Sequence, residues 1–538
     1  MRWFAAMLAL CVACSGDSPT GEIEYRVERY DARIDLTQKT ATIGAIVDVE
    51  VGGDCLTIPS RAAPVAARWN DGQPRSGDFR DGTISLCGAG VDAGDDLVIE
   101  VDTSLTEDTW EDLQVGFSIS DDIEGQPFQY LVSWVGGCDR FGPCDNAPDR
   151  FASYRFEVVH DPAETVLCSG TITSEPGLTI CETDYRAPTY STFGLAASRS
   201  WTAVDLGSWG GIPVTFYDMP SSATVERVRS DIHSQFMDWL SERFGPYPFG
   251  QELRLAVGPT VWNGFEHPDN ILLNDDLRND PLGGGYEDRL THTINHEIAH
   301  MWAGNRTTLA SEKDFVWKEA TVEYLTMTFE DEVVGASTAR RTALAWKTFS
   351  RGAQFFPIPT EGAALIDYYG DSYGPGPMIL FRQLEALFDR DSVLAALATV
   401  LQSESAISVE DIRLALEEQT GANLSGYFDS WLRGSGSPVW PTFAVSFEQD
   451  GDQVTVTVDQ LSPAKPMGCA FAVELQGPAD EVAEVWIDRG VDGQMSTQVV
   501  ATVAFAVEGT RLDPHGHCLA YGPGASERHS PRNPWRAR

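Results

Sequence analysis

Two histidines, His296 and His300, lie four residues apart in the segment THTINHEIAHMWAGN, and Glu297 directly follows the first. Four residues of a helix turn by about 400°, so both imidazole rings project from one face. Two imidazoles placed in this way can bind one Zn²⁺ at about 2.0–2.1 Å each, with Glu297 close enough to serve as general base toward an activated water. The alternative is a histidine pair on the surface of a polar helix, and this segment alone leaves it open.

A further carboxylate lies 19 residues after His300, at Glu319 in SEKDFVWKEATVEYL. This stretch predicts a second, amphipathic helix, and the interval is long enough for one helix to end and another to return. Glu319 can then complete a His₂Glu site whose fourth position is left to water. Zinc would lower the pKa of that water and polarise a carbonyl, and Glu297 would accept the proton. The residues expected to face inward are Phe315, Val316, Ala320, Val322, Tyr324 and Leu325. The sequence therefore predicts a metallohydrolase with one Zn²⁺ per chain.

The apolar pattern of the chain changes twice along its 538 residues. Up to about residue 203, short segments alternate apolar and polar residues between Gly, Asp and Pro, which predicts half-buried strands. From about residue 223 to residue 431 apolar residues recur three and four apart, which predicts helices, and alternation then returns. We expect a signal peptide (1–13), a tether (14–22), an N-terminal β domain (23–205), a middle domain rich in helices (206–435), a C-terminal β domain (436–522) and a disordered tail (523–538).

The formal net charge is -42, from 38 basic and 80 acidic residues, and the pI is about 4.4. Such a surface repels a phosphate backbone, so nucleic acid is excluded as a partner. The acidity itself is typical of a protein kept soluble outside the cell.

The first residues resemble an export signal. Arg2 precedes an apolar run, WFAAMLALCVA, that is too short to span a bilayer, and Cys14 follows small residues. This pattern favours a bacterial lipoprotein signal with Cys14 as the lipidated residue, and simple secretion is the alternative. We therefore expect an exported protein of the periplasm or outer membrane that contacts the membrane only through an N-terminal lipid anchor.

Cysteine usage agrees with export, because eight cysteines remain when Cys11 and Cys14 are set aside, and no two of these eight form a C-x-x-C motif. They fall into couples that are local in sequence, although the sequence alone allows 105 connectivities. The expected disulfides are Cys55–Cys87, Cys138–Cys144, Cys168–Cys181 and Cys469–Cys518.

This arrangement resembles the zinc-binding signature of the aminopeptidase N family: HEIAH, then 18 residues, then the glutamate of WKEATVEYL. This gluzincin family also contains the leukotriene hydrolases. The resemblance extends to RFGPCDNAPDRFASYRFEV, ERFGPYPF and YFDSWLRGSGSPVWPTFAVSF. It implies a multidomain α+β fold with an N-terminal all-β saddle domain, a thermolysin-like, mostly α-helical catalytic domain and a C-terminal β-sandwich. The sequence ends after the sandwich, so the resemblance implies a member without the large C-terminal helical domain.

Two substrate-handling elements are implied by position. VWNGFEHPDNILLN resembles the family's exopeptidase strand, with Glu266 in the place of the glutamate that holds the α-ammonium of the substrate. The backbone of Asn263, Gly264 and Phe265 would pair with the extended peptide. DSYGPGPMILF resembles a helix start in the family and places Tyr373 at the residue that stabilises the oxyanion. Tyr368 and Tyr369 remain rival candidates.

This sequence departs from the family pattern at several positions. The family usually has Gln or Glu as a second amine anchor about ten residues before the cysteine of its F-P-C segment. Here Ser133 or Trp134 occupies that stretch, so Glu266 is left as the only anchor. Four other positions also differ from the usual residue: Phe265, His267, Lys318 and Pro375.

These features together predict a zinc-dependent aminopeptidase that acts on peptides with a free N-terminus. The same chemistry would allow a gluzincin endopeptidase or an epoxide-hydrolysing relative. The lack of a second amine anchor leaves these alternatives open. A catalytically inactive binding or scaffold protein with the same fold is the alternative of another class. The preferred N-terminal residue and the oligomeric state stay open.

Overall fold

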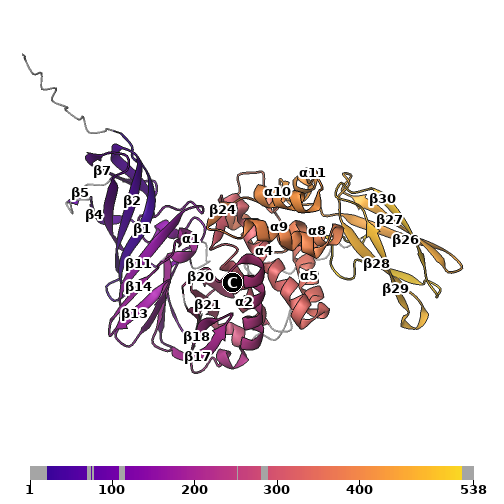
Figure 1. Cartoon of the computed structure of the whole chain (residues 1–538), viewed down its shortest axis with the longest axis horizontal. Coiled ribbons are helices and arrows are strands. Elements are labelled where there is room, and N and C mark those ends of the chain that lie inside the picture. Colours follow the sequence, from indigo (N-terminus) through magenta and orange to yellow (C-terminus); the bar gives the residue numbers. More distant parts are fainter. Residues whose placement is uncertain are drawn as a thin grey trace, which may run out of the picture.

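The computed structural model describes residues 21–69, 74–75, 78–107, 115–250, 252–279 and 289–523. Three regions follow one another along the long axis of the molecule in Figure 1: sheets in indigo and purple, helices in magenta and orange, and further sheets in yellow. The chain is therefore a multidomain α+β protein, as predicted. The expected signal segment, Cys14 and residues 524–538 lie outside the described residues.

The N-terminal region consists of three sheets whose strands alternate buried and partly exposed residues, as in β11. The largest has nine strands in the order β13-β14-β11-β1-β2-β8-β4-β5, with β15 paired to β11; β1 and β11 are parallel. The other two have the orders β12-β16-β10-β9 and β3-β7-β6. Their bounds are β1 Glu24–Asp35, β2 Thr40–Val51, β3 Gly53–Pro59, β4 Pro64–Arg68, β5 Pro74–Arg75, β6 Asp78–Arg80, β7 Thr83–Val91, β8 Asp96–Ser104, β9 Gly116–Asp121, β10 Pro127–Val132, β11 Phe151–Val159, β12 Thr165–Cys168, β13 Thr171–Glu175, β14 Leu178–Glu182, β15 Ala187–Pro188 and β16 Gly194–Ser198.

A five-stranded sheet begins the middle region, in the order β17-β18-β19-β21-β20. The boundary expected after residue 205 falls inside β17, and β17 pairs with β18, so this strand belongs to the middle region. Within the part of the chain that the structure describes, β20 is the last strand of the sheet and pairs only with β21. The bounds are β17 Thr202–Trp209, β18 Ile212–Asp218, β19 Leu253–Gly258, β20 Gly264–His267 and β21 Asn270–Asn274.

Helices make up most of the remaining middle region. The bounds are α1 Thr189–Thr192 in the N-terminal region, then α2 Ser230–Phe244, α3 Arg289–His300, α4 Phe315–Phe329, α5 Ala336–Ser350, α6 Leu365–Ser372, α7 Pro375–Pro377, α8 Gln383–Leu387, α9 Arg390–Val400, α10 Val409–Thr420 and α11 Ser425–Trp431. Two π-helical turns, Glu330–Val334 and Met378–Arg382, extend α4 and α7. Short paired strands join distant loops: β22 Thr307–Leu309 with β24 Ser405–Ile407, and β23 Ile358–Pro359 with β25 Arg433–Gly434.

The prediction that α4 is amphipathic was wrong. All 15 of its residues are buried, polar ones included. A helix can be buried all round when it crosses the centre of a domain, and its polar groups must then find partners inside the protein. Those partners lie at the site described below.

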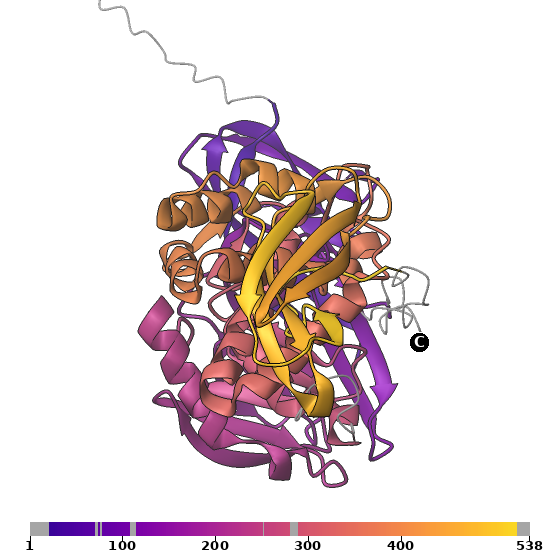
Figure 2. The same cartoon turned by 90° about the vertical axis from the view of Figure 1, so that its right-hand side faces the viewer.

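Two three-stranded sheets, β26-β27-β30 and β29-β28-β31, form the C-terminal region, which faces the viewer in Figure 2. Their bounds are β26 Thr442–Asp450, β27 Gln453–Ser462, β28 Ala470–Gln476, β29 Val482–Asp488, β30 Ser496–Thr502 and β31 Gly509–Leu512. One hydrophobic core runs from β10, at Phe128 and Tyr130, through the middle helices, at Trp431, and into these C-terminal sheets at Phe471. A second core lies within the N-terminal sheets.

Three of the four expected cysteine pairs are joined: Cys55–Cys87, Cys138–Cys144 and Cys168–Cys181. The fourth expectation was wrong, because Cys469 and Cys518 are buried free thiols. The two thiols are neighbours, as the expected pairing requires, but they are joined by a hydrogen bond and not by a disulfide bond. None of the helices that the structure describes has the length and apolar character needed to cross a membrane.

Candidate active site

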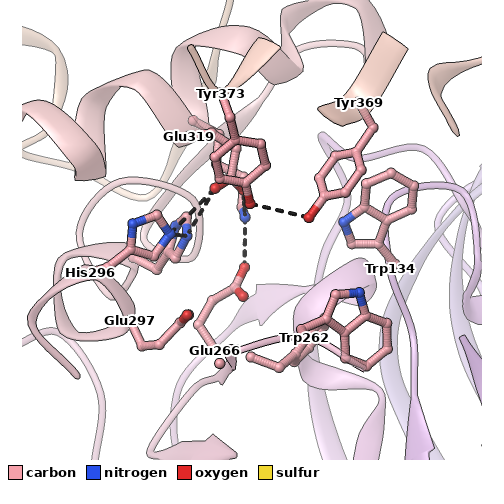
Figure 3. Close-up of a pocket in the computed structure, with 12 residues that line it drawn as sticks. Trp134, Trp262, Glu266, His296, Glu297, Glu319, Tyr369 and Tyr373 are labelled. Carbon is pink, nitrogen blue, oxygen red and sulfur yellow. Dashed lines mark hydrogen bonds and ion pairs between the residues drawn. The ribbon is translucent and has the colours of Figure 1, made fainter. Parts of the chain in front are cut away.

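Helices α3 and α4 pack against each other at the centre of the middle region and bring three ligand atoms together. Nε2 of His296 lies 3.2 Å from Nε2 of His300. Oε2 of Glu319 lies 3.4 Å from the first of these nitrogens and 3.6 Å from the second. The structure thus brings together the two histidines of one helix and the glutamate of the next (Figure 3).

The geometry of this triangle fits Zn²⁺. Ligands at about 2.0–2.1 Å on the corners of a tetrahedron are about 3.3–3.4 Å from one another, close to the three distances observed. Glu319 Oε2 is also buried and accepts no hydrogen bond among the described residues, which a cation between the three groups would explain. Imidazole nitrogen and carboxylate oxygen are donors that zinc accepts in catalytic sites. A carboxylate oxygen of Glu297 and a ring nitrogen of each histidine all lie within 4.8 Å of one another, so Glu297 lies beside both histidines.

Each histidine is held at its other ring nitrogen. Nδ1 of His300 lies 3.1 Å from the carbonyl oxygen of Ala303, and Nδ1 of His296 lies 3.1 Å from Oε1 of Glu323. An N–H on each Nδ1 leaves Nε2 as the acceptor that a metal requires. Sequence reasoning missed Glu323, although it lies four residues after Glu319 and so on the same face of α4.

Glu323 also connects the histidines to a wider buried network. Its Oε2 accepts a hydrogen bond of 3.0 Å from Nε1 of Trp346 and lies 3.4 Å from Nε2 of His292. Nδ1 of His292 lies 2.8 Å from Oε1 of Glu330. Burial alone would lower the pKa of His292, but Glu330 and Glu323 outweigh it and raise the pKa to about 9. His292 is therefore a cation enclosed by two carboxylates.

Glu297 lies against strand β20 because residue 264 is glycine. A Cβ on Gly264 would come within 2.6 Å of Cγ and 2.7 Å of Cδ of Glu297, so any side chain there would displace this carboxylate. Burial raises the pKa of Glu297 to about 8, against the lowering effect of the His296 imidazole. A buried carboxylate with a raised pKa suits a general base.

Strand β20 brings Glu266 to the same cavity, where Glu266 meets a lysine. Nζ of Lys318 lies 2.7 Å from Oε1 of Glu266 and 2.8 Å from Oε1 of Glu319. Burial alone would raise the pKa of Glu266, but the Lys318 ammonium outweighs it and lowers the pKa. Sequence reasoning noted Lys318 only as a departure from a family pattern and did not place it in the site.

Among the described residues no strand pairs with the edge of β20 that faces away from β21, so this edge can receive an extended peptide, although the Glu266 carbonyl already accepts a hydrogen bond of 3.4 Å from Asn305. Gly264 and Phe265 belong to this strand and line the cavity. Asn263 directly precedes the strand, and its side chain accepts a hydrogen bond of 2.6 Å from Arg289.

Tyr373 and Tyr369 both line the cavity, and their hydroxyls lie 3.1 Å apart. In Figure 3 the Tyr373 ring lies beside Glu319, and Tyr369 lies next to Trp134. Burial raises the pKa of Tyr373 well above its usual range, with Glu319 adding to the shift, so the hydroxyl stays protonated. Tyr368 is directed elsewhere, because its hydroxyl donates to the carbonyl of Glu312 at 3.4 Å.

Tryptophans occupy the remaining wall. Trp134 and Trp262 line the cavity and lie on the far side of Glu266 from His296 in Figure 3. Ser133 does not reach the cavity, since its hydroxyl donates to the carbonyls of Thr189 and Tyr190 at 3.1 and 2.7 Å. Trp134 therefore occupies the wall at the stretch where the family pattern usually has a second amine anchor and where the sequence predicted none.

Known proteins resemble this chain in sequence and in fold. Residues 229–431 match the family described as "Peptidase family M1 domain". Aminopeptidase N of Streptomyces lividans is 24% identical over 517 residues, which cover 87% of this chain and 59% of that protein. Glutamyl aminopeptidase of Bos taurus is 23% identical over 321 residues, which cover 55% of this chain and 33% of that protein.

A solved structure, Legionella pneumophila aminopeptidase A in complex with aspartic acid, matches with a TM-score of 0.72 and 17% identity. The match covers 93% of this chain and 60% of the other, and at this identity it shows a shared fold. The chain thus spans 59% of the length of the Streptomyces relative and 60% of the Legionella chain.

Proposed function

Because this chain belongs to the aminopeptidase N family of metallopeptidases, we propose that it is a zinc-dependent aminopeptidase that hydrolyses the N-terminal peptide bond of peptides. The observation that carries the proposal is the triangle of His296, His300 and Glu319 beside Glu266 on a free strand edge. A metal site next to an edge strand and a buried carboxylate can bind a peptide and hold its terminal amine.

In the proposed site, His296, His300 and Glu319 hold one Zn²⁺ per chain. Zinc in such a site supplies Lewis acidity that activates water and polarises a carbonyl. Glu297 accepts a proton from the attacking water and returns it to the leaving amine. Tyr373 donates its hydroxyl hydrogen bond to the oxyanion.

The substrate is positioned by groups on β20. The strand edge at Gly264 and Phe265 pairs with the extended peptide, and Glu266 receives the α-ammonium in a charge-assisted hydrogen bond. The bond to be cleaved is then one residue from the anchored amine, which accounts for release of single N-terminal residues.

A gluzincin endopeptidase, or an epoxide-hydrolysing relative, is the second candidate. It is favoured by the ion pair between Glu266 and Lys318 and by Trp134 in place of a second amine anchor, since both reduce the negative charge open to an ammonium. A catalytically inactive scaffold of the same fold is the candidate of another class, and it predicts no zinc-dependent turnover.

One pair of substrates separates these candidates. A peptide with a free N-terminus and its N-acetylated twin would be compared on protein with a measured zinc content, with and without a chelator. The aminopeptidase proposal expects chelator-sensitive cleavage of the free-amine peptide and little cleavage of the acetylated one. Equal rates on the two peptides would support the endopeptidase, and absence of turnover on a panel of aminoacyl substrates would support the scaffold.

We also propose that the protein acts outside the cytoplasm, held at the cell envelope by a lipid on Cys14. Three disulfide bonds support an oxidising compartment. Metabolic labelling with a radioactive or alkyne-bearing fatty acid, compared between wild type and Cys14→Ser, tests the anchor.

A further inference from the structure

We propose that Lys318 is a positioning residue that ties the metal-binding carboxylate of Glu319 to the amine-binding carboxylate of Glu266. The inference rests on the proposed function for the role of Glu266. It assigns to one buried ammonium the task of orienting two carboxylates that serve different parts of the reaction.

The contacts of Lys318 are short and shielded from solvent. Its Nζ lies 2.7 Å from Oε1 of Glu266 and 2.8 Å from Oε1 of Glu319, and the lysine is 2% exposed. The two carboxylates are 5% and 3% exposed. An ammonium has three N–H donors, so it can donate to both carboxylates at once. At these distances and this burial, the position of each carboxylate depends on the other through the shared donor.

The surrounding residues confine the lysine side chain to this position. A Cβ on Gly304 would lie 3.0 Å from Cε of Lys318, and Gly304 has a φ of +133°, so glycine leaves room for the lysine stem. The rings of Tyr190 and Phe315 lie 5.9 and 5.8 Å from Nζ, where their faces favour a cation. Tyr190 belongs to α1 of the N-terminal region, so the lysine is enclosed from two domains.

The bridge decides which oxygen of each carboxylate remains for function. Lys318 takes Oε1 of Glu319, and Oε2 is left facing the two histidine nitrogens at 3.4 and 3.6 Å. A hydrogen bond to one oxygen of a ligating carboxylate orients the other toward the metal. Lys318 likewise takes Oε1 of Glu266, which leaves Oε2 as the oxygen to receive the substrate amine.

Charge in the cavity points to the same role. Glu266, Glu297 and Glu319 all line the cavity, and among the described residues that line it Lys318 is the only lysine or arginine. Without this cation two neighbouring buried carboxylates would repel each other and turn apart or take up a proton. Either change would move the metal ligand and the amine anchor together.

The test compares Lys318→Met with Lys347→Met. Lys347, in helix α5, is a second buried lysine, and its Nζ lies 2.6 Å from Oδ2 of Asp513. It is not among the cavity-lining residues. Lys318→Met removes two buried ion-pair contacts and Lys347→Met removes one, and both variants keep a side chain of similar length. Zinc affinity, measured by competition with a chromogenic chelator, should fall about 10–100-fold in Lys318→Met and stay within about threefold of wild type in Lys347→Met. Equal zinc affinities of Lys318→Met and wild type would overturn the proposal.

A kinetic arm at saturating zinc tests the link to Glu266. KM for a free-amine substrate should rise in Lys318→Met, with a smaller change in kcat. The double variant Glu266→Gln, Lys318→Met should have the KM of Glu266→Gln alone, since the lysine acts on the amine through Glu266. Additive KM effects would contradict this half of the proposal.

The zinc-binding and kinetic experiments remain interpretable if a variant does not fold or if the proposed function fails. If Lys318→Met does not fold, as judged by circular dichroism, Lys318→Gln replaces it, with the expectation of weakened zinc binding and the same overturning result. If wild type cleaves neither free-amine nor acetylated peptides, the proposed function fails, while the zinc competition still decides whether Lys318 positions Glu319.

Discussion

Oε1 of Glu323 lies 3.1 Å from Nδ1 of His296, at the ring nitrogen opposite the one that faces Glu319. One carboxylate of α4 therefore orients the histidine, and another, one turn away on the same helix, faces it as the third ligand of the proposed metal site. The ring is held from both sides, so its position does not depend on the metal alone.

The first prediction concerns this orienting contact. Glu323→Gln should weaken zinc binding by about 10–100-fold, because an amide stabilises the required His296 tautomer less well than a carboxylate. Chelator competition measures the change. Glu385→Gln is the matched control, since Glu385 also accepts a hydrogen bond from an aromatic side chain, Tyr324, but its ion pairs are with Arg382 and Arg390 and not with a histidine of the proposed metal site. An equal loss in both variants would mean that general destabilisation, not orientation, is responsible.

The second prediction concerns the base. Glu297→Gln should retain zinc and lower kcat by about 10²–10⁴-fold, because an amide cannot accept the proton of water. Metal analysis and steady-state kinetics on the same preparation measure the two effects. Near wild-type turnover in a zinc-loaded variant would remove Glu297 from the mechanism.

The third prediction uses the close approach of β20 to Glu297. Gly264→Ala should lower kcat about as much as loss of the base does, up to about 10²–10⁴-fold, because the new Cβ displaces the carboxylate. Gly362→Ala is the control, since a Cβ there meets no atom within 4 Å. A crystal structure or kinetics that left Glu297 and kcat unchanged in Gly264→Ala would contradict the assigned packing.

The fourth prediction separates three neighbouring tyrosines. Tyr373→Phe should lower kcat by about 10²–10³-fold with little change in KM, as expected for loss of an oxyanion donor. Tyr369→Phe should have a smaller effect through its hydrogen bond to Tyr373, and Tyr368→Phe should have none, because its hydroxyl is directed to Glu312. If Tyr369→Phe lost more activity than Tyr373→Phe, the two roles would be exchanged.

The fifth prediction concerns the pH dependence of stability. The pKa of His292 is about 9 in the folded protein and about 6.5 in the unfolded chain. The charged imidazolium therefore contributes its full stabilisation of the fold below about pH 6.5. This contribution, on the order of 3 kcal/mol, should decline as pH rises and be lost above about pH 9. Urea unfolding of zinc-loaded wild type and Glu330→Gln between pH 6 and 10 measures it. Parallel pH profiles for the two proteins would show that Glu330 does not hold the charge on His292.

Much of the site followed from local spacing. The four-residue interval of His296 and His300 places both rings on one side of any α-helix, whatever surrounds it. Glu319 was found because 18 intervening residues suit a helix, a turn and a second helix. The same reasoning described α4 as amphipathic and failed there, because periodicity reports polar side chains but not that they face one another inside the protein.

The fourth cysteine pair shows the same limit. Cys469 and Cys518 were coupled correctly in space, yet they are free thiols, since adjacency along the folded chain does not by itself form a bond. Residue 205, expected at a domain boundary, lies within β17, because alternation continues across the change from one sheet to the next.

The sequence by itself predicted His296, His300 and Glu319 as a ligand set and Glu297 as a base, and it determined the class of fold, because these depend on residue types at helical spacing and on recurring motifs. Only the tertiary structure decided how Glu266 is used. Lys318 and Glu266 are 52 positions apart, on a helix and on an edge strand, and no periodic pattern relates them. Their ion pair forms because burial leaves each charge no water to pair with, and a buried charge takes the nearest opposite charge that the fold provides.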